Sequence, residues 1–115
     1  NYRKAVRLLA RTGPLIGAFD RIRKGLEPVP AKASKSIAWN FLWCLFGKEP
    51  TATQEKSIDV ALVLHAEHEL NASTFTTRVI SATLSDMHSA VAGGVGALKG
   101  TLHGGAGDCG SPNSG

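Results

Sequence analysis

The sequence is poor in cysteine and holds no apolar segment near the roughly 20 residues that span a bilayer. Its two cysteines, Cys44 in an apolar run and Cys109 in a glycine-rich tail, do not form the pattern of a disulfide framework. We therefore expect a reducing, cytoplasmic location and no membrane association. Residue 1 is not methionine, and the first residues form no signal-peptide pattern, so we expect the chain to start inside a longer protein.

Acidic residues are scarce in the first 30 positions, where seven Lys and Arg residues face only Asp20 and Glu27. A basic segment can bind nucleic acid or anionic groups such as cofactor phosphates. Aromatic residues are not interleaved with these charges, however, as they are in single-strand binding surfaces. We interpret the segment as a solvated helix face and predict no nucleic-acid partner.

Alternation of polar and apolar residues with the period of a strand is absent, and so are internal repeats and heptads. Apolar residues recur instead at spacings of three and four, which is typical of amphipathic helices. At 115 residues, the chain is long enough for one small domain. We predict an all-α fold of about six helices. They comprise one helix that Gly13-Pro14 interrupts, a second from Pro14 to Gly25, a buried one at 35–45, one from 51 through His65, one starting at Asn71 or Ser73, and one at 87–98.

Local signals indicate where several of these helices begin. Thr51 and Gln54 have the spacing of a capping box, and Asp86 is placed to cap the last helix. That last helix has Gly93, Gly94 and Gly96 in its interior, where each glycine costs up to about 1 kcal/mol relative to alanine. Such glycines indicate a backbone that another helix approaches closely.

Histidine is the residue type that offers chemistry, and three interpretations of the four histidines compete. A metal site is disfavoured, because His65 and His68 are three residues apart, whereas helical zinc motifs place their histidines four apart. A structural role, in hydrogen bonds to nearby carbonyls, is favoured for His65 and His88. An anion-binding or acid–base role suits His68, at a helix end, and His103, beside glycines that leave the backbone open to a ligand.

The tail contains a G-x-G-x-x-G pattern at Gly105, Gly107 and Gly110. It follows no predicted strand and opens no predicted helix, so it fails the context that dinucleotide binding requires. We predict no metal and no cofactor. We also predict one partial helical domain over residues 1–106 and a divergent, disordered tail over residues 107–115.

Three segments carry a family resemblance. Residues 62–75, LVLHAEHELNASTF, closely resemble the LHADHELNASTF segment of bacterial citrate synthases. Residues 83–86 (TLSD) and 97–106 (ALKGTLHGGA) resemble the STLSD and GALKGPLHGGA segments of the same family. The resemblance extends more loosely over residues 1–106. This chain departs from the family pattern at Glu67, His88 and Thr101 and again after Ala106.

The resemblance implies a fragment of an acyltransferase of the tricarboxylic acid cycle that condenses oxaloacetate with acetyl-CoA to give citrate and CoA. It implies that His68 binds oxaloacetate and that His103 acts on the thioester carbonyl of acetyl-CoA, which is a substrate and not a cofactor. The family's catalytic aspartate, its carboxylate-binding arginines and a second substrate histidine lie further along the chain. We therefore expect this chain to be inactive alone and its full-length parent to be a homodimer.

Two alternatives remain open at this point. The related 2-methylcitrate synthases, which use propionyl-CoA, share the same motifs, so the sequence does not choose the acyl group. The chain can also be interpreted as a non-catalytic helical dimerisation module, with the small residues of the segment 89–98 forming the contact surface.

Overall fold

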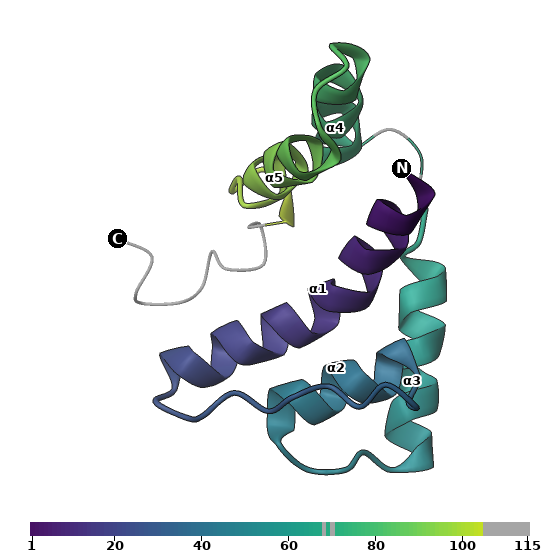
Figure 1. Cartoon of the computed structure of the whole chain (residues 1–115), viewed down its shortest axis with the longest axis vertical. Coiled ribbons are helices and arrows are strands. Elements are labelled where there is room, and N and C mark those ends of the chain that lie inside the picture. Colours follow the sequence, from purple (N-terminus) through teal and green to yellow (C-terminus); the bar gives the residue numbers. More distant parts are fainter. Residues whose placement is uncertain (68, 70, 105–115) are drawn as a thin grey trace. The chain divides into compact units, whose positions relative to one another are not determined.

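The computed structural model describes residues 1–67, 69 and 71–104. These residues form five α-helices and no strand, which confirms the predicted all-α fold (Figure 1). The chain divides into two compact units, Asn1–Glu67 with helices α1 to α3 and His68–Gly115 with helices α4 and α5. The predicted domain of residues 1–106 and the predicted tail are not tested by this division, and the tail lies outside the described residues.

Helix α1, Tyr2–Arg23, runs without a break through Pro14, so the interruption predicted at Gly13-Pro14 is wrong. Packing against the next helix explains the continuity. A Cβ added at Gly13 would lie 3.4 Å from the Cβ of Phe41, and one added at Gly17 would lie 2.6 Å from the carbonyl carbon of Cys44. The two glycines let another backbone approach α1 on both sides of the proline, and this contact outweighs the local tendency to break. Two predicted helices are therefore one.

Helix α2, Ile37–Phe46, is the buried helix that the sequence predicts. The Ser36 hydroxyl accepts a hydrogen bond from the backbone N–H of Trp39 at 3.0 Å, and Gly47 ends the helix with a left-handed φ of 69°. Left-handed backbone suits glycine because it has no Cβ. The buried apolar side chains of this unit all come from α2: Ala38, Trp39, Leu42 and Cys44.

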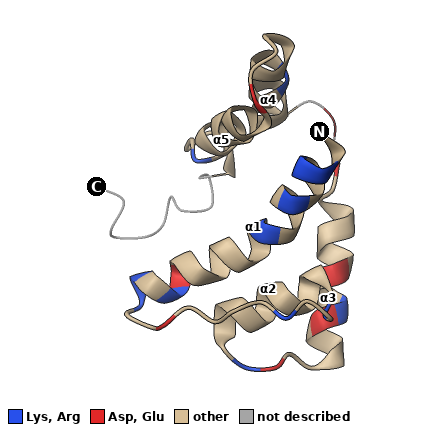
Figure 2. Cartoon of the chain, in the orientation of Figure 1, with Lys and Arg blue, Asp and Glu red and all other residues tan. Residues whose placement is uncertain are grey.

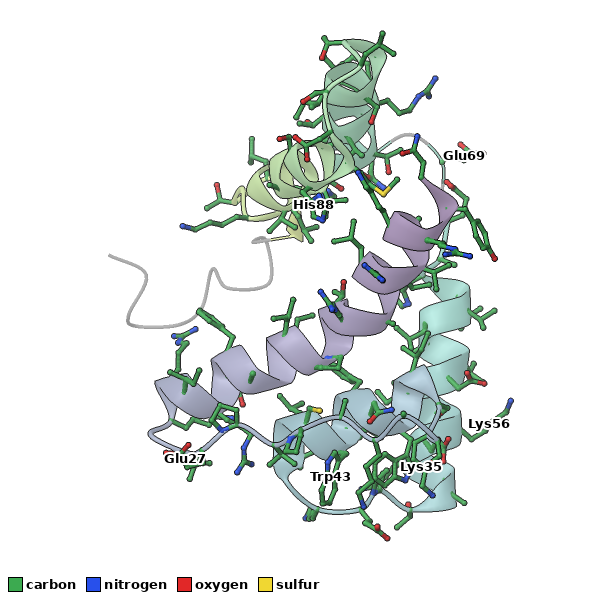
Figure 3. The ribbon with its side chains drawn as sticks, in the orientation of Figure 1. Glu27, Lys35, Trp43, Lys56, Glu69 and His88 are labelled. Carbon is green, nitrogen blue, oxygen red and sulfur yellow. The ribbon has the colours of Figure 1, made fainter. Side chains whose placement is uncertain are left out.

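The loop before α2 is fixed to that helix by the side chain of Asn40, which is only 9% exposed. Its Oδ1 accepts from the backbone N–H of Lys32 at 2.7 Å, and its Nδ2 donates to the carbonyl oxygens of Lys32, Lys35 and Ser36. Figure 3 shows Lys35 and Trp43 on the side of α2 that faces away from α1. The loop therefore has a defined path.

Helix α3, Ala52–Leu64, begins with the predicted capping box. Gln54 N–H donates to Thr51 Oγ1 at 3.2 Å, and Thr51 N–H donates to Gln54 Oε1 at 2.9 Å. The Ser36 hydroxyl donates to Glu55 Oε1 at 2.5 Å, which joins the start of α2 to α3. Both hydrogen bonds of the capping box are present, so the capping prediction is confirmed. It could be made from the sequence because the two partners lie only three residues apart, within the first turn of the helix.

The second unit pairs α4, Ala72–Ala82, with α5, Met87–Leu98. Asn71 caps α4 and Asp86 caps α5, as the sequence predicts. A Cβ added at Gly93 or Gly94 would clash with Ile80 or Thr77 of α4, respectively. The predicted close approach is therefore confirmed at these two glycines, whereas nothing lies within 4 Å of a Cβ built at Gly96.

Candidate functional site

His103 lies just after α5, in a turn closed by its own backbone N–H, which donates to the carbonyl of Gly100 at 2.9 Å. Its side chain is half-buried. A Cβ added at Gly104 would lie 2.6 Å from the carbonyl oxygen of Leu98, so this turn folds tightly against the end of α5. The glycine after the histidine therefore serves the turn that presents the imidazole.

The imidazole of His103 reaches the first turn of α4, thirty residues earlier in the chain. Its Nε2 lies 3.0 Å from the hydroxyl oxygen of Ser73. The Ser73 hydroxyl donates to Asn71 Oδ1 at 2.7 Å. Asn71 Oδ1 also accepts a hydrogen bond from the backbone N–H of Thr74 at 2.8 Å. The cap of α4 and the candidate catalytic histidine thus belong to one hydrogen-bonded chain.

Ser73 has one hydroxyl proton for two possible acceptors, and this limits the state of the imidazole. When the proton points to Asn71 Oδ1, the Ser73 oxygen accepts from a protonated Nε2 of His103. When it points to Nε2, a neutral His103 carries its proton on Nδ1. In both arrangements Nε2 is occupied by Ser73, so Nδ1 is the ring nitrogen left to meet a ligand.

The other three histidines differ in their positions and contacts. His68 lies outside the described residues, so its predicted role in substrate binding stays a prediction. His65 Nδ1 contacts the carbonyl oxygen of Ala61 at 2.7 Å, which is the structural role predicted for it. His88 (labelled in Figure 3) is exposed on the first turn of α5. Its Nδ1 lies 3.5 Å from Oδ1 of Asp86.

Within the described ranges, no three side chains of His, Cys, Asp or Glu gather as they would around a metal ion. Nor does any described helix combine the length and the hydropathy that crossing a membrane requires. The Lys and Arg residues of α1 concentrate in its first half and at its end (Figure 2).

A groove of about 310 Å³ lies between α4 and α5, next to the histidine contact. Ser73 lines it, together with Thr74, Thr77 and Arg78 of α4, and Val91 and Val95 lie among the α5 residues opposite. A larger hollow, of about 660 Å³, is lined by α3 residues alone and holds none of the predicted site residues. The groove of the second unit is therefore the hollow associated with the candidate chemistry.

Sequence reasoning missed Ser73 and Asn71 as partners of His103 and considered them only as alternative caps of α4. The capping signal is local and readable, and it correctly predicts a polar group at the start of that helix. Nothing in the sequence relates this cap to a histidine thirty positions later. Only the packing of α4 on α5 brings the two together.

Comparison with known proteins gives a consistent result. Residues 1–108 match the family model described as citrate synthase, C-terminal domain. The chain is 58% identical over 106 residues to citrate synthase 2 of Bacillus subtilis, covering 92% of this chain and 28% of that protein. It is 47% identical over 110 residues to 2-methylcitrate synthase 2 of Corynebacterium glutamicum, covering 90% and 29%, respectively. The chain thus spans little more than a quarter of these relatives.

Solved structures agree with the sequence comparison. Citrate synthase from Pyrobaculum aerophilum superposes with a TM-score of 0.89 at 44% identity, over 94% of this chain and 26% of that one. Citrate synthase from Thermoplasma acidophilum, in a ternary complex with carboxymethyl coenzyme A and oxaloacetate, superposes with a TM-score of 0.82 at 34% identity. This match covers 89% of the present chain and 27% of the Thermoplasma acidophilum chain.

Proposed function

The chain belongs to the citrate synthase family, and from this premise we propose that it forms part of an acyltransferase that condenses oxaloacetate with acetyl-CoA to give citrate and CoA. The observation that carries the proposal is the contact of 3.0 Å between His103 Nε2 and Ser73, which directs one ring nitrogen away for a ligand. The presence of oxaloacetate and a coenzyme A derivative in the Thermoplasma acidophilum complex supports the choice of substrates.

In the proposed reaction, His103 stabilises the acyl donor as it becomes a nucleophile. Loss of a methyl proton from acetyl-CoA places negative charge on the thioester oxygen, and a hydrogen-bond donor at that oxygen lowers the barrier. The Nδ1 of His103 is that donor when the Ser73 proton points to Nε2, or when the imidazole carries both protons. The new carbon–carbon bond forms at the keto carbon of oxaloacetate, and water then cleaves the thioester.

The remaining groups of this reaction are not supplied by the described residues. We assign oxaloacetate binding to His68, which lies outside them, and proton removal to an aspartate further along the parent protein. Because the reaction needs these further groups, we propose that the chain is inactive alone. We also propose that the enzyme uses no metal or cofactor and that the parent protein is cytoplasmic. Acetyl-CoA is a substrate in this scheme.

A chimeric enzyme tests the proposal. In citrate synthase 2 of Bacillus subtilis, the segment that matches residues 1–106 is replaced by these residues, which are 58% identical to it. We expect the chimera to release CoA from acetyl-CoA only when oxaloacetate is present, and the isolated chain to release none. A folded chimera without this activity contradicts the proposal, and so does turnover by the isolated chain.

Substitutions in the chimera test the assigned roles. We expect His103→Gln to lower kcat by about 10²-fold or more, because it removes the donor to the developing oxyanion. Ser73→Ala removes one hydrogen bond worth about 1 kcal/mol, so we expect a fall of roughly fivefold. His88→Gln is the matched control on an exposed histidine and should leave kcat unchanged.

A second candidate function is that of a 2-methylcitrate synthase, which condenses propionyl-CoA instead. The identity of 47% to a relative with that name keeps it in consideration. The chimera is assayed with both acyl donors beside the unmodified host. A shift of at least tenfold toward propionyl-CoA in the ratio of the two kcat/KM values favours this candidate, and an unchanged ratio leaves acetyl-CoA as the proposed donor.

Self-association is the third possibility. The small residues of the segment 89–98 were the predicted contact surface, and of these α4 of the same chain covers Gly93 and Gly94, whereas Val91, Val95 and Gly96 are exposed. The exposed apolar side chains of α1, among them Leu15, Phe19 and Ile22, offer a second surface, and we propose that the parent dimerises. Light scattering on the isolated chain tests whether it is only a dimerisation module. If it is, the chain forms a discrete dimer in the absence of any ligand.

A further inference from the structure

The turn that carries His103 is attached to the C-terminal end of α5 at two points. Gly100 N–H donates to the carbonyl of Ala97 at 3.2 Å, and His103 N–H donates to the carbonyl of Gly100 at 2.9 Å. On the other side of the histidine, a Cβ built at Gly104 would lie 2.6 Å from the carbonyl oxygen of Leu98. The backbone of His103 is therefore held between a hydrogen-bonded turn and a close contact.

Space, and not backbone conformation, is what Gly104 requires. Of the described glycines, only Gly25 and Gly47 have the left-handed φ that favours glycine, so the backbone of Gly104 places no such demand. A Cβ built there would lie 2.6 Å from Cδ1 of Leu98 as well as from its carbonyl oxygen. The leucine side chain can rotate away, but the carbonyl belongs to the last residue of α5 and cannot.

The size of this clash can be compared with the contact of the imidazole. Ordinary contact with a Cβ begins near 3.4 Å, so a side chain at Gly104 would have to move about 0.8 Å away from the carbonyl of Leu98. Nε2 of His103 lies 3.0 Å from the hydroxyl oxygen of Ser73, and a side-chain hydrogen bond is lost beyond about 3.5 Å. A displacement of that size is enough to break the contact.

The partner of the imidazole does not follow such a displacement. Ser73 lies in the first turn of α4, and a Cβ built at Gly94 of α5 would lie 3.4 Å from its carbonyl oxygen and 2.4 Å from Thr77 Oγ1. Helix packing therefore sets the position of Ser73 against α5, independently of the turn. When the turn moves, the distance from His103 to Ser73 changes.

We propose that Gly104 is a positioning residue for His103. Because it has no side chain, the turn closes on the last carbonyl of α5, which places Nε2 against Ser73 and leaves Nδ1 for a ligand. The donation from Nδ1 to the thioester oxygen rests on the proposed function, whereas the placement of the imidazole does not. Gly104 acts through His103 and touches no substrate itself.

Three Gly→Ala variants of the whole 115-residue chain form a graded series that tests this inference. A Cβ at Gly96 has open space, whereas one at Gly100 or Gly104 would lie 3.2 Å or 2.6 Å, respectively, from a carbonyl oxygen of the last turn of α5. Nuclear Overhauser effects from the His103 ring protons beside Nε2 to the Ser73 β protons report the contact. We expect these effects to be unchanged in Gly96→Ala, weaker in Gly100→Ala and lost in Gly104→Ala. Equal effects in all three variants overturn the proposal.

Amide hydrogen exchange distinguishes a local displacement from a loss of fold. Gly104 lies outside both α4 and α5, so we expect Gly104→Ala to leave the exchange rates of these helices within about twofold of the parent chain. Faster exchange throughout both helices would show that Gly104 is needed for folding, and this result overturns the positioning role.

The chimera tests whether Gly104 acts through the imidazole. We expect Gly104→Ala to lower kcat by roughly 10-fold to 10²-fold, because a misplacement of about 1 Å can cost that much, and to leave the KM for oxaloacetate within about twofold. In a chimera that already carries His103→Gln, the same substitution should lower kcat by less than about twofold more. Equal losses in the two backgrounds overturn the proposal, and Gly96→Ala is the matched control with unchanged kcat.

These measurements also separate the positioning role from the proposed function, because the Overhauser effects are measured without substrate. If Gly104→Ala removes them while the folded chimera lacks activity, the positioning role stands and the proposed reaction fails. If the chimera is active and Gly104→Ala changes neither the Overhauser effects nor kcat, the reaction stands and this inference fails.

Discussion

The two units of the chain are both built on a helix pair joined through glycines, yet they differ in what the pairing buries. In the first unit, Gly17 of α1 lies against the backbone of Cys44, and α2 contributes two larger buried side chains, Trp39 and Leu42. In the described part of the second unit, Ala90 is the apolar side chain that is buried. The first unit therefore has a core of its own, whereas the second relies on close helix contact and hydrogen bonds.

This difference separates stability from chemistry. Large buried side chains leave no space beside them, and the hollows at the first unit lie along α3 and at the start of α2. The small residues of α4 and α5 instead leave an open groove lined by hydroxyl groups and one arginine. The candidate site thus lies in the unit with the smaller core.

The substitution with the largest expected effect is Gly17→Ala. Its Cβ would lie 2.6 Å from the carbonyl carbon of Cys44, and backbone atoms cannot move aside as a side chain can. We expect a loss of about 2–3 kcal/mol in the free energy of unfolding, despite the better helix propensity of alanine. Both tryptophans lie in α2, so urea unfolding followed by tryptophan fluorescence measures this unit. An unchanged midpoint would falsify the packing argument, and Gly13→Ala on the same helix, where the added Cβ would lie at a distance of 3.4 Å from the Cβ of Phe41, is the control that should lose much less.

Asn40→Ala should have the next largest effect. The substitution leaves the partly buried N–H of Lys32 and three carbonyl groups without the side chain that fixes the loop to α2. We expect a loss of about 2 kcal/mol, measured by the same fluorescence experiment. Lys56→Ala, which removes only an exposed ion pair with Asp59, should change stability by less than about 0.5 kcal/mol. Equal effects of the two substitutions would contradict this account of the loop.

Gly93→Ala tests the second unit and should have a smaller effect than Gly17→Ala. The added Cβ meets the end of the Ile80 side chain, which can rotate away, and alanine favours the helix by up to about 1 kcal/mol. We expect stability within about 1 kcal/mol of the parent, read from amide hydrogen exchange in α4 and α5. A loss of stability as large as that of Gly17→Ala would show that both helix pairs tolerate an added Cβ equally poorly.

The smallest expected effect concerns the cap of α5. Hydrogen bonds from the Ser89 side chain and backbone lower the pKa of Asp86 from 3.8 to about 2. Because the folded-state pKa is below the unfolded one, the cap's contribution is present above about pH 4 and is lost as the pH falls toward 2. Carboxyl carbon resonances should show a midpoint near pH 2 for Asp86. Ser89→Ala should raise that midpoint toward 3.8, and an unaltered value would rule out Ser89 as the main cause.

Helix starts were the features most completely predicted from the sequence. Thr51, Asn71 and Asp86 each accept a hydrogen bond from a backbone N–H three residues later, so the pattern that predicts the cap also contains its partner. The break at Gly13-Pro14 was predicted wrongly by the same kind of local reasoning. Its outcome depends on Phe41 and Cys44, nearly thirty residues away.

The sequence by itself determined the all-helical class, the caps of the helices and the family, because each of these depends on short segments whose residues interact with near neighbours or match known motifs. The tertiary structure alone decided that α1 is continuous and that Ser73 holds His103. It alone placed Arg78 in the groove. Those features arise from packing between helices, where contact depends on which small residues let two backbones approach, and no local pattern encodes the partner.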